Sequence, residues 1–209
     1  MKHVFFEPWV GSNYNTGGIF NKKILVLGES HYCANPECKD KCGFKDFPDG
    51  GCEDFTANTV LDYLDPKKER GTWMPTYLKF ERSLVGEYTT PDKSKEIWNS
   101  IAFYNYLQVA LTEARKAGSD DDYKDSKESF FEVINELQPD LIIIWGKRLF
   151  YKLPEDNWIE GDSLIIDDKE VKNGYYQLKN GKKVRCITVY HPSTGYSWDL
   201  WHDVIKSQL

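Results

Sequence analysis

The sequence contains no long hydrophobic run. Among its 209 residues the longest apolar stretch covers residues 141–145, whereas a membrane-spanning helix needs about 20 apolar residues. The first eleven residues carry one lysine and lack the apolar core of about 7–15 residues that defines a signal peptide. We therefore expect a cytoplasmic protein with no membrane partner, and no feature of the sequence indicates a protein partner.

A surplus of positive charge is also absent. The chain has 27 Lys and Arg against 33 Asp and Glu, which gives a net charge of −6 at pH 7. A protein that holds nucleic acid mainly by neutralising phosphates carries the opposite charge, so any contact with DNA requires a local basic patch. Repeats, low-complexity tracts and linker-like segments are missing too, and an apolar content of 40% excludes a disordered chain. We expect one domain over residues 1–209.

A complete set of paired cysteines is missing, because the chain has five cysteines and an odd number argues against a closed disulfide framework. Four of them crowd a loop at residues 31–54 that is rich in Asp, Gly and Pro; they are Cys33, Cys38, Cys42 and Cys52. Four thiolates in one loop can close a tetrahedral structural zinc site, which would order a segment that has no core of its own. An iron–sulfur cluster ranks below zinc, free thiols are the alternative, and no cofactor is required for chemistry.

Four short apolar runs predict β-strands. They cover residues 23–27, 100–104, 141–145 and 184–190. The first and third are nearly continuous, which is typical of strands buried on both faces of a parallel sheet. We therefore expect these four runs to lie side by side in the centre of the fold.

The segments between the predicted strands show helical periodicity. Apolar residues at helical spacing predict helices near residues 74–85, 91–98, 130–137 and 197–207. Asn180-Gly181 lies between two strand-like segments and predicts a hairpin with an antiparallel strand. The alternation indicates a three-layer α/β/α fold with a central, mainly parallel four-stranded sheet and a hairpin near the C-terminus.

Polar and aromatic residues follow each predicted strand. The segments are Gly28-Glu29-Ser30-His31-Tyr32, then Asn105, then Gly146-Lys147-Arg148, and finally His191-Pro192-Ser193. Taken singly, each residue has an ordinary structural role, such as a turn glycine, a helix cap or a loop histidine. The carboxyl ends of parallel strands meet at one edge of a sheet, however, and that edge is where ligands bind. Their shared position therefore predicts one functional site.

These strand-end motifs resemble those of the uracil-DNA glycosylase superfamily. The resemblance rests on residues 24–29, 103–105, 139–146 and 191–193, which follow the same order along most of the chain. It implies a uracil-DNA glycosylase-like fold. It also implies DNA or a nucleotide as partner, and hydrolysis of the N-glycosidic bond of a flipped uracil or damaged base.

The resemblance implies a role for several residues. His191 would donate a hydrogen bond to the base oxygen that gains charge as the bond breaks, and Asn105 would bind the amide edge of the base. Glu29 would orient water or stabilise the positively charged sugar. The base-binding residues would be Gly28, Ser30, His31, Tyr32, Asn105 and Ser193, with Tyr32 crowding the pyrimidine 5-position.

Two positions depart from the pattern of the superfamily. Ser30 stands where the most active members carry Asp or Asn to activate water, and His31 replaces the usual proline. The usual DNA-wedge sequence after residue 193 is absent, so a tyrosine or tryptophan would have to serve as the wedge. The candidates for DNA contact are Lys147, Arg148, Tyr196 and Trp198.

Two other interpretations stay open. A GDSL/SGNH-type serine esterase also has a Gly-acid-Ser turn after its first strand. Ser30 would then be the nucleophile, His202 its base and Asp199 the orienting acid. The other interpretation is a non-catalytic module that keeps the glycosylase fold to bind a nucleotide or nucleic acid, which Ser30 and the acidic charge both favour.

Overall fold

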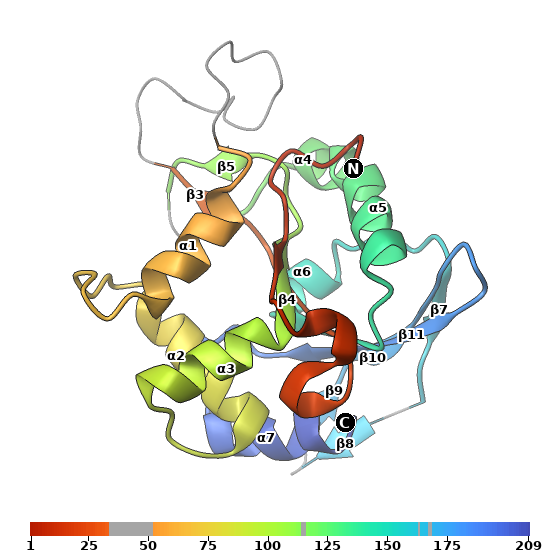
Figure 1. The fold of residues 1–209 in the computed structure, drawn as a ribbon. Coiled ribbons are helices and arrows are strands. Elements are labelled where there is room, and N and C mark those ends of the chain that lie inside the picture. Colours follow the sequence, from red (N-terminus) through yellow and green to blue (C-terminus); the bar gives the residue numbers. More distant parts are fainter. Residues whose placement is uncertain (34–51, 114–115, 163, 167–168) are drawn as a thin grey trace.

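The structure is a computed structural model that describes residues 1–33, 52–113, 116–162, 164–166 and 169–209. Its centre is a mixed β-sheet (Figure 1). The strand order in this sheet is β1-β4-β2-β6-β11-β10-β7. The four middle strands run parallel to one another: β4 (Ile101–Asn105), β2 (Ile24–Gly28), β6 (Leu141–Trp145) and β11 (Lys183–Val189). The antiparallel strands at the two sides are β1 (Trp9–Val10), β10 (Asn173–Gln177) and β7 (Trp158–Glu160).

Strands β2 and β6 are apolar throughout because both faces of the sheet are buried there. In β2, Ile24 and Val26 belong to the core on one face, while Leu25 and Leu27 belong to the core on the other. This alternation follows from the two-residue period of a strand. It explains why the run has no polar residue between Ile24 and Gly28.

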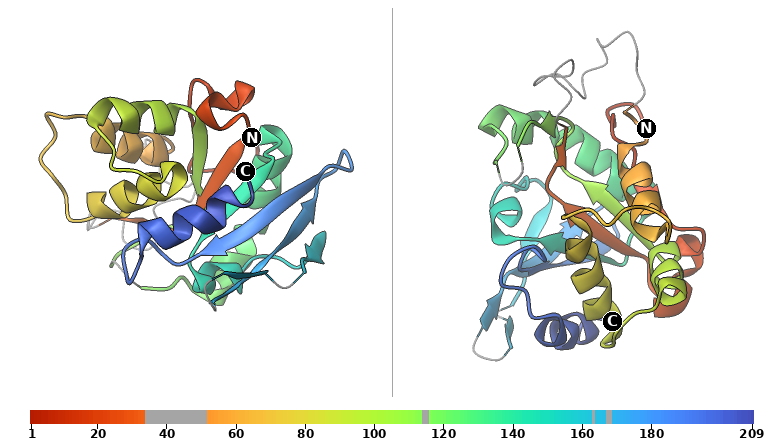
Figure 2. Two further views of the ribbon diagram at one scale, coloured as in Figure 1. Left: turned by 90° about the horizontal axis from the view of Figure 1, so that it is seen from below. Right: turned by 90° about the vertical axis from the view of Figure 1, so that its left-hand side faces the viewer.

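Helices cover both faces of the sheet (Figures 1 and 2). One core is completed by α1 (Phe55–Leu64), α2 (Met74–Val85), α3 (Pro91–Asn99) and α7 (Trp198–Lys206). The other is completed by α4 (Asp120–Asp125), α5 (Lys127–Leu137) and α6 (Lys147–Phe150). The short elements are η1 (Tyr14–Thr16), η2 (Gly18–Phe20), β3 (His31–Tyr32), β5 (Ala110–Leu111), β8 (Leu164–Ile166) and β9 (Lys169–Val171). No helix in the described ranges is long and apolar enough to cross a membrane.

The predicted α/β architecture is confirmed, but the predicted sheet of four strands is wrong. The four predicted strands are present and adjacent, and the hairpin around Asn180-Gly181 joins β10 to β11. The sheet described here has seven strands and is mixed. Strands β1 and β7 are two and three residues long, which is too short for an alternating apolar pattern to be recognised.

The predicted helix boundaries follow from capping residues. The Thr90 side chain accepts a hydrogen bond from the Lys93 backbone N–H at 3.3 Å, and Pro91 occupies the first turn of α3. Helix α5 ends at Leu137, where Gln138 takes a left-handed conformation before Pro139. These local signals set the lengths of the helices that pack on the sheet.

A buried carboxylate joins α2 to the segment that follows it. Glu81 is fully buried and accepts hydrogen bonds from Ser94 Oγ at 2.7 Å and from Trp98 Nε1 at 3.0 Å, as well as from Thr89. A buried carboxylate is stable only where such donors replace water. The network therefore fixes α2 against α3, and α2 carries part of the wall of the cavity described below.

Replacing Ile143 with alanine tests the central position of β6. Ile143 is 0% exposed and lies between β2 and β11. Loss of its side chain leaves a cavity, so the free energy of unfolding should fall by about 2–5 kcal/mol. The matched control is Ile165→Ala in β8, because Ile165 is 64% exposed and its loss should change stability by less than about 0.5 kcal/mol. Equal effects in chemical denaturation would contradict this architecture.

Candidate functional site

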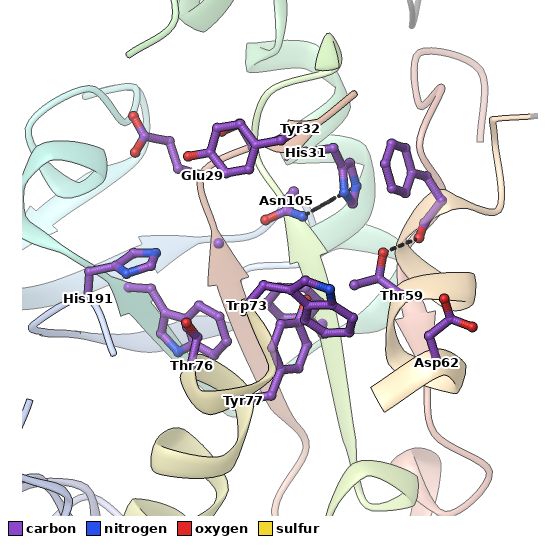
Figure 3. A pocket seen from close by; sticks show the side chains of 15 residues that line it. Glu29, His31, Tyr32, Thr59, Asp62, Trp73, Thr76, Tyr77, Asn105 and His191 are labelled. Atoms are coloured by element: carbon purple, nitrogen blue, oxygen red, sulfur yellow. Dashed lines mark hydrogen bonds between the residues drawn. The ribbon is translucent and has the colours of Figure 1, made fainter. Parts of the chain in front are cut away.

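The carboxyl ends of the four parallel strands surround a cavity. In the sheet register, Gly28 of β2 lies beside Asn105 of β4, and Trp145 of β6 lies beside Val189 of β11. The cavity has a volume of about 320 Å³. The strands and the segments that follow them contribute Gly28, Glu29, Ser30, His31, Tyr32, Phe103, Asn105, Trp145 and His191 (Figure 3). The first predicted segment, Asn105 and His191 therefore meet at this cavity, whereas the predicted third segment, residues 146–148, does not line it.

Helices α1 and α2 supply the opposite wall. Phe55, Thr59 and Asp62 come from α1, and Trp73, Thr76 and Tyr77 come from the start of α2. The sequence interpretation missed this wall. A signal for it exists, because Phe55, Thr59 and Asp62 have the i, i+4, i+7 spacing that places side chains on one helix face.

Glu29 is held on two sides. Arg148 donates to it through Nε at 2.8 Å and through Nη2 at 2.6 Å, and the Tyr123 hydroxyl donates to the same carboxylate. The hydrogen bond and charge of Glu29 raise the pKa of Arg148, and burial, followed by the neighbouring Glu29, raises the pKa of Tyr123. In Figure 3 the Glu29 carboxylate points away from Asn105. The Glu29 oxygens therefore mainly bind Arg148 and Tyr123 and contribute less to the lining of the cavity.

The side chain of Asn105 lies between Gly28 and His31 and contacts both. Its amide Nδ2 lies 3.2 Å from His31 Nδ1 and 3.3 Å from Nε2. Its Oδ1 lies against Gly28, since a Cβ added at that glycine would be only 2.2 Å from the oxygen. In Figure 3 the amide nitrogen points to His31 and the oxygen points the opposite way, toward the cavity. Gly28 is thus required by the close approach of a side chain.

His31 is a buried, neutral histidine. Burial lowers its pKa from 6.5 to about 3, because the charged imidazole cannot be hydrated there. Its ring stacks on Phe55 with the centroids 4.4 Å apart and lies edge-on to Phe6. Nε2 is 3.1 Å from Thr56 Oγ1. The ring is fixed by packing on its faces and by hydrogen bonds at its edge.

His191 lies across the cavity from Asn105 (Figure 3). The backbone N–H of Ser193 donates to its Nδ1 at 3.2 Å, and Ser193 Oγ is 2.7 Å from the same nitrogen. A backbone N–H can only donate, so Nδ1 accepts and the neutral ring carries its proton on Nε2. Burial lowers the pKa of His191; Glu29 raises it and Arg148 lowers it by smaller amounts. His191 therefore presents a neutral N–H donor to the cavity.

Two remaining cavity residues from the predicted base-binding set differ in exposure. Tyr32 is 42% exposed, at the rim. The Ser30 hydroxyl is buried and has no hydrogen-bond partner in the described structure. Ser193, by contrast, contributes through His191 and does not itself line the cavity.

The four residues expected to contact DNA differ in their exposure and in their contacts. Arg148 pairs with Glu29, and Lys147 Nζ lies 5.4 Å from the centre of the Tyr190 ring. Tyr196 is buried, and its hydroxyl is 2.7 Å from Ser83 Oγ. The expectation that Tyr196 could act as a surface wedge is therefore wrong, because its ring is part of the core between α2 and α7. Trp198 is half-buried and packs edge-on against the exposed Tyr88.

The esterase residues are not brought together. His202 Nδ1 is 3.1 Å from the Ser83 carbonyl, and its ring packs against Gly86 at the end of α2. Asp199 accepts a hydrogen bond from Ser197 instead of orienting His202. Among the described residues the Ser30 hydroxyl has no hydrogen-bond partner, so it makes no contact with His202 of the kind that joins nucleophile and base in a serine hydrolase.

The cysteine loop lies only partly within the described residues. Cys38 and Cys42 lie outside them. Cys33 and Cys52 pack against a small apolar cluster that includes Phe6, and both are free thiols. The described part of the chain contains no group of three or more His, Cys, Asp or Glu that could hold a metal ion. The zinc site stays a prediction.

Comparison with known proteins leaves the family of this chain open. No protein-family model matches the sequence, and a search of curated proteins found no match. The function of the cavity has to be inferred from its geometry.

Removing Arg148 tests the pairing with Glu29. In Arg148→Met the Glu29 carboxylate keeps its burial but loses its charged donor, so the free energy of unfolding should fall by about 1–3 kcal/mol. Adding Glu29→Gln should recover part of the loss. The control Lys152→Met removes a pair on the surface with the exposed Asp120 and should leave stability unchanged. Equal losses in the two single variants would contradict the proposed importance of the pair.

The buried state of His31 predicts a pH dependence. The folded protein keeps His31 neutral down to pH about 3, whereas the unfolded chain binds a proton below its ordinary pKa of 6.5. Protonation thus favours unfolding, and this contribution to stability falls as pH drops through that window, by up to about 1.4 kcal/mol per pH unit. The stability difference between the wild type and His31→Phe should shrink correspondingly. A difference that stays constant from pH 7 to pH 4 would contradict the burial of a neutral ring.

Proposed function

We propose that this chain is a uracil-DNA glycosylase-like protein that binds a flipped uracil or damaged base of DNA in the cavity and hydrolyses its N-glycosidic bond. The observation that carries the proposal is the pair formed by Asn105 and His191. An amide acceptor and a neutral imidazole donor face one cavity from opposite sides (Figure 3).

The shape of the cavity supports a planar ligand. Its volume of about 320 Å³ is at the low end of the range of about 300–1,000 Å³ for ligand sites. The aromatic residues on its wall are Tyr32, Phe55, Trp73, Tyr77, Phe103 and Trp145. Aromatic rings stack on the faces of bases, while the polar groups bind base edges. A single base fits this combination of size and lining.

The chemistry proposed for His191 is electrostatic. As the bond from the base to the sugar breaks, the electron pair moves onto the base and charge develops on its carbonyl oxygen. A preorganised N–H donor stabilises that charge without any movement of the protein. Because Ser193 fixes the proton on Nε2, His191 is ready to donate in its neutral form.

Two carboxylates, Glu29 and Asp62, lie on the cavity wall. The Glu29 carboxylate is bound by Arg148 and Tyr123, so we propose that it contributes to the electrostatic potential at the rim of the cavity. Asp62 is paired with Lys68 at 2.9 Å, and its side chain is 45% exposed, which leaves it in contact with water. Asp62 is ion-paired as well, so the attacking water is assigned to neither carboxylate.

Two observations favour a second candidate function, a module that binds a base without cleaving it. Ser30 replaces the usual acidic or amide residue of the superfamily, and the Glu29 carboxylate is engaged by other side chains. Under this alternative the same residues bind the base, and no abasic site forms.

A glycosylase assay separates the two functions. Single- and double-stranded oligonucleotides that carry uracil or damaged bases are incubated with the protein, and abasic sites are counted. His191→Ala should lower the rate by about 100- to 1,000-fold, the loss expected for one transition-state donor. The matched control is His202→Ala, because His202 bonds to α2 and does not line the cavity; it should retain wild-type activity.

Three results decide the assay. Abasic sites that depend on His191 and not on His202 support the glycosylase. Binding of the oligonucleotides without cleavage favours the binding module. Activity that survives in His191→Ala, or that depends on His202, contradicts the site.

A further inference from the structure

A second cavity lies between the end of α6 and the strands β7 and β10. Its volume is about 530 Å³, which is within the range of small-molecule sites. Its described lining shares no residue with the cavity at the strand ends. Four aromatic residues and two carboxylates make up most of its wall: Phe150, Tyr151, Trp158 and Tyr176, with Glu155 and Glu160.

The aromatic rings of this second cavity meet at steep angles. The centre of the Phe150 ring is 5.4 Å from that of Tyr151 and 5.6 Å from that of Trp158, and each of these two rings is inclined at 75° to it. Trp158 also lies 5.0 Å from Tyr176, its partner in the β7–β10 register, at an angle of 62°. Rings at such angles do not form one flat stack. They therefore border the cavity from more than one direction.

Hydrogen bonds and close packing hold the rings in place. Trp158 Nε1 donates to Glu160 Oε2 at 2.8 Å, and the Tyr176 hydroxyl donates to the Pro154 carbonyl at 2.7 Å. The indole lies against Gly174, where an added Cβ would be only 2.2 Å from Cζ2 of Trp158. Because the wall is ordered before a ligand arrives, binding costs less conformational entropy.

The charge on this wall is negative. Glu155 and Glu160 line the cavity and are exposed. Lys172 is the one cation among the described lining residues, and Glu170 balances its charge at 2.7 Å. The hydrogen bond with Glu170 raises the pKa of Lys172, and the charge of Glu160 acts in the same direction by a smaller amount. The surroundings of the cavity thus already favour positive charge.

We propose that the second cavity binds a small molecule that carries a quaternary ammonium group. Such a cation is attracted to the faces of aromatic rings, and it has no N–H group that would need an acceptor. The two carboxylates complement its charge and would repel the phosphates of a nucleotide or of DNA. This inference is independent of the proposed function, because the two cavities share no described residue.

Two variants each remove one of the features that the inference uses. Tyr151 is 64% exposed, so Tyr151→Leu removes a ring with little effect on the fold. Glu160→Gln removes a charge, while the glutamine oxygen can still accept from Trp158 Nε1. The matched control is Tyr88→Leu, because Tyr88 is 74% exposed and lies outside the cavity. Thermal denaturation confirms that each variant is folded before binding is measured.

The test is an NMR titration of the full chain with choline that follows the indole N–H of Trp158. The ligand control is 3,3-dimethylbutan-1-ol, which has the shape of choline without its charge. Choline should bind saturably and about 10-fold more tightly than the alcohol. Tyr151→Leu should weaken choline binding by about 3- to 30-fold, the range expected for the loss of one cation–π contact. Glu160→Gln should weaken it in the same direction, and Tyr88→Leu should leave it unchanged.

The outcomes separate a cation site from other sites. Choline binding that exceeds binding of the alcohol and weakens in both cavity variants supports the inference. Equal binding of the two compounds overturns it, because the cavity would then select shape without charge. Choline binding that is unchanged in both variants, or the absence of saturable binding, overturns it as well. A trimethyllysine peptide that binds where choline does not would indicate a protein partner and overturn the assignment to a small molecule.

Discussion

The contact between the Asn105 amide and the backbone of Gly28 is the constraint on which the cavity depends. The two residues are paired in register at the ends of β2 and β4, and only a residue without a Cβ allows the amide to lie where it does. The same amide is bonded to His31, which packs on Phe55 of α1. The sheet edge and the first helix are thereby joined through one side chain.

The central strands and the position of the site were accessible from the sequence. Continuous apolar runs such as residues 141–145 identify buried parallel strands because both faces are covered. Once the strands are parallel, the residues after them must meet at one edge, and Asn105 and His191 do so. This part follows from periodicity and chain direction alone.

The remainder depends on contacts between distant segments. Glu29 pairs with Arg148, 119 positions away, and with Tyr123, 94 positions away. The sequence around each of these three residues contains no signal that predicts the pairing. The burial of Tyr196 follows from the packing of α7 on α2, which leaves no surface position for its ring. Exposure of an aromatic residue is a tertiary property, which is why the sequence could not exclude it as a wedge.

The central claim is that the cavity binds a base between the Asn105 carbonyl and the neutral His191 donor. It is tested most directly by an NMR titration with uracil that follows the side-chain nitrogens of asparagine and histidine. The account predicts that the signals of the Asn105 amide and of His191 Nε2 shift together with one Kd, while those of His202 stay fixed. Saturating binding that leaves Asn105 and His191 unshifted, or no binding at all, would contradict it.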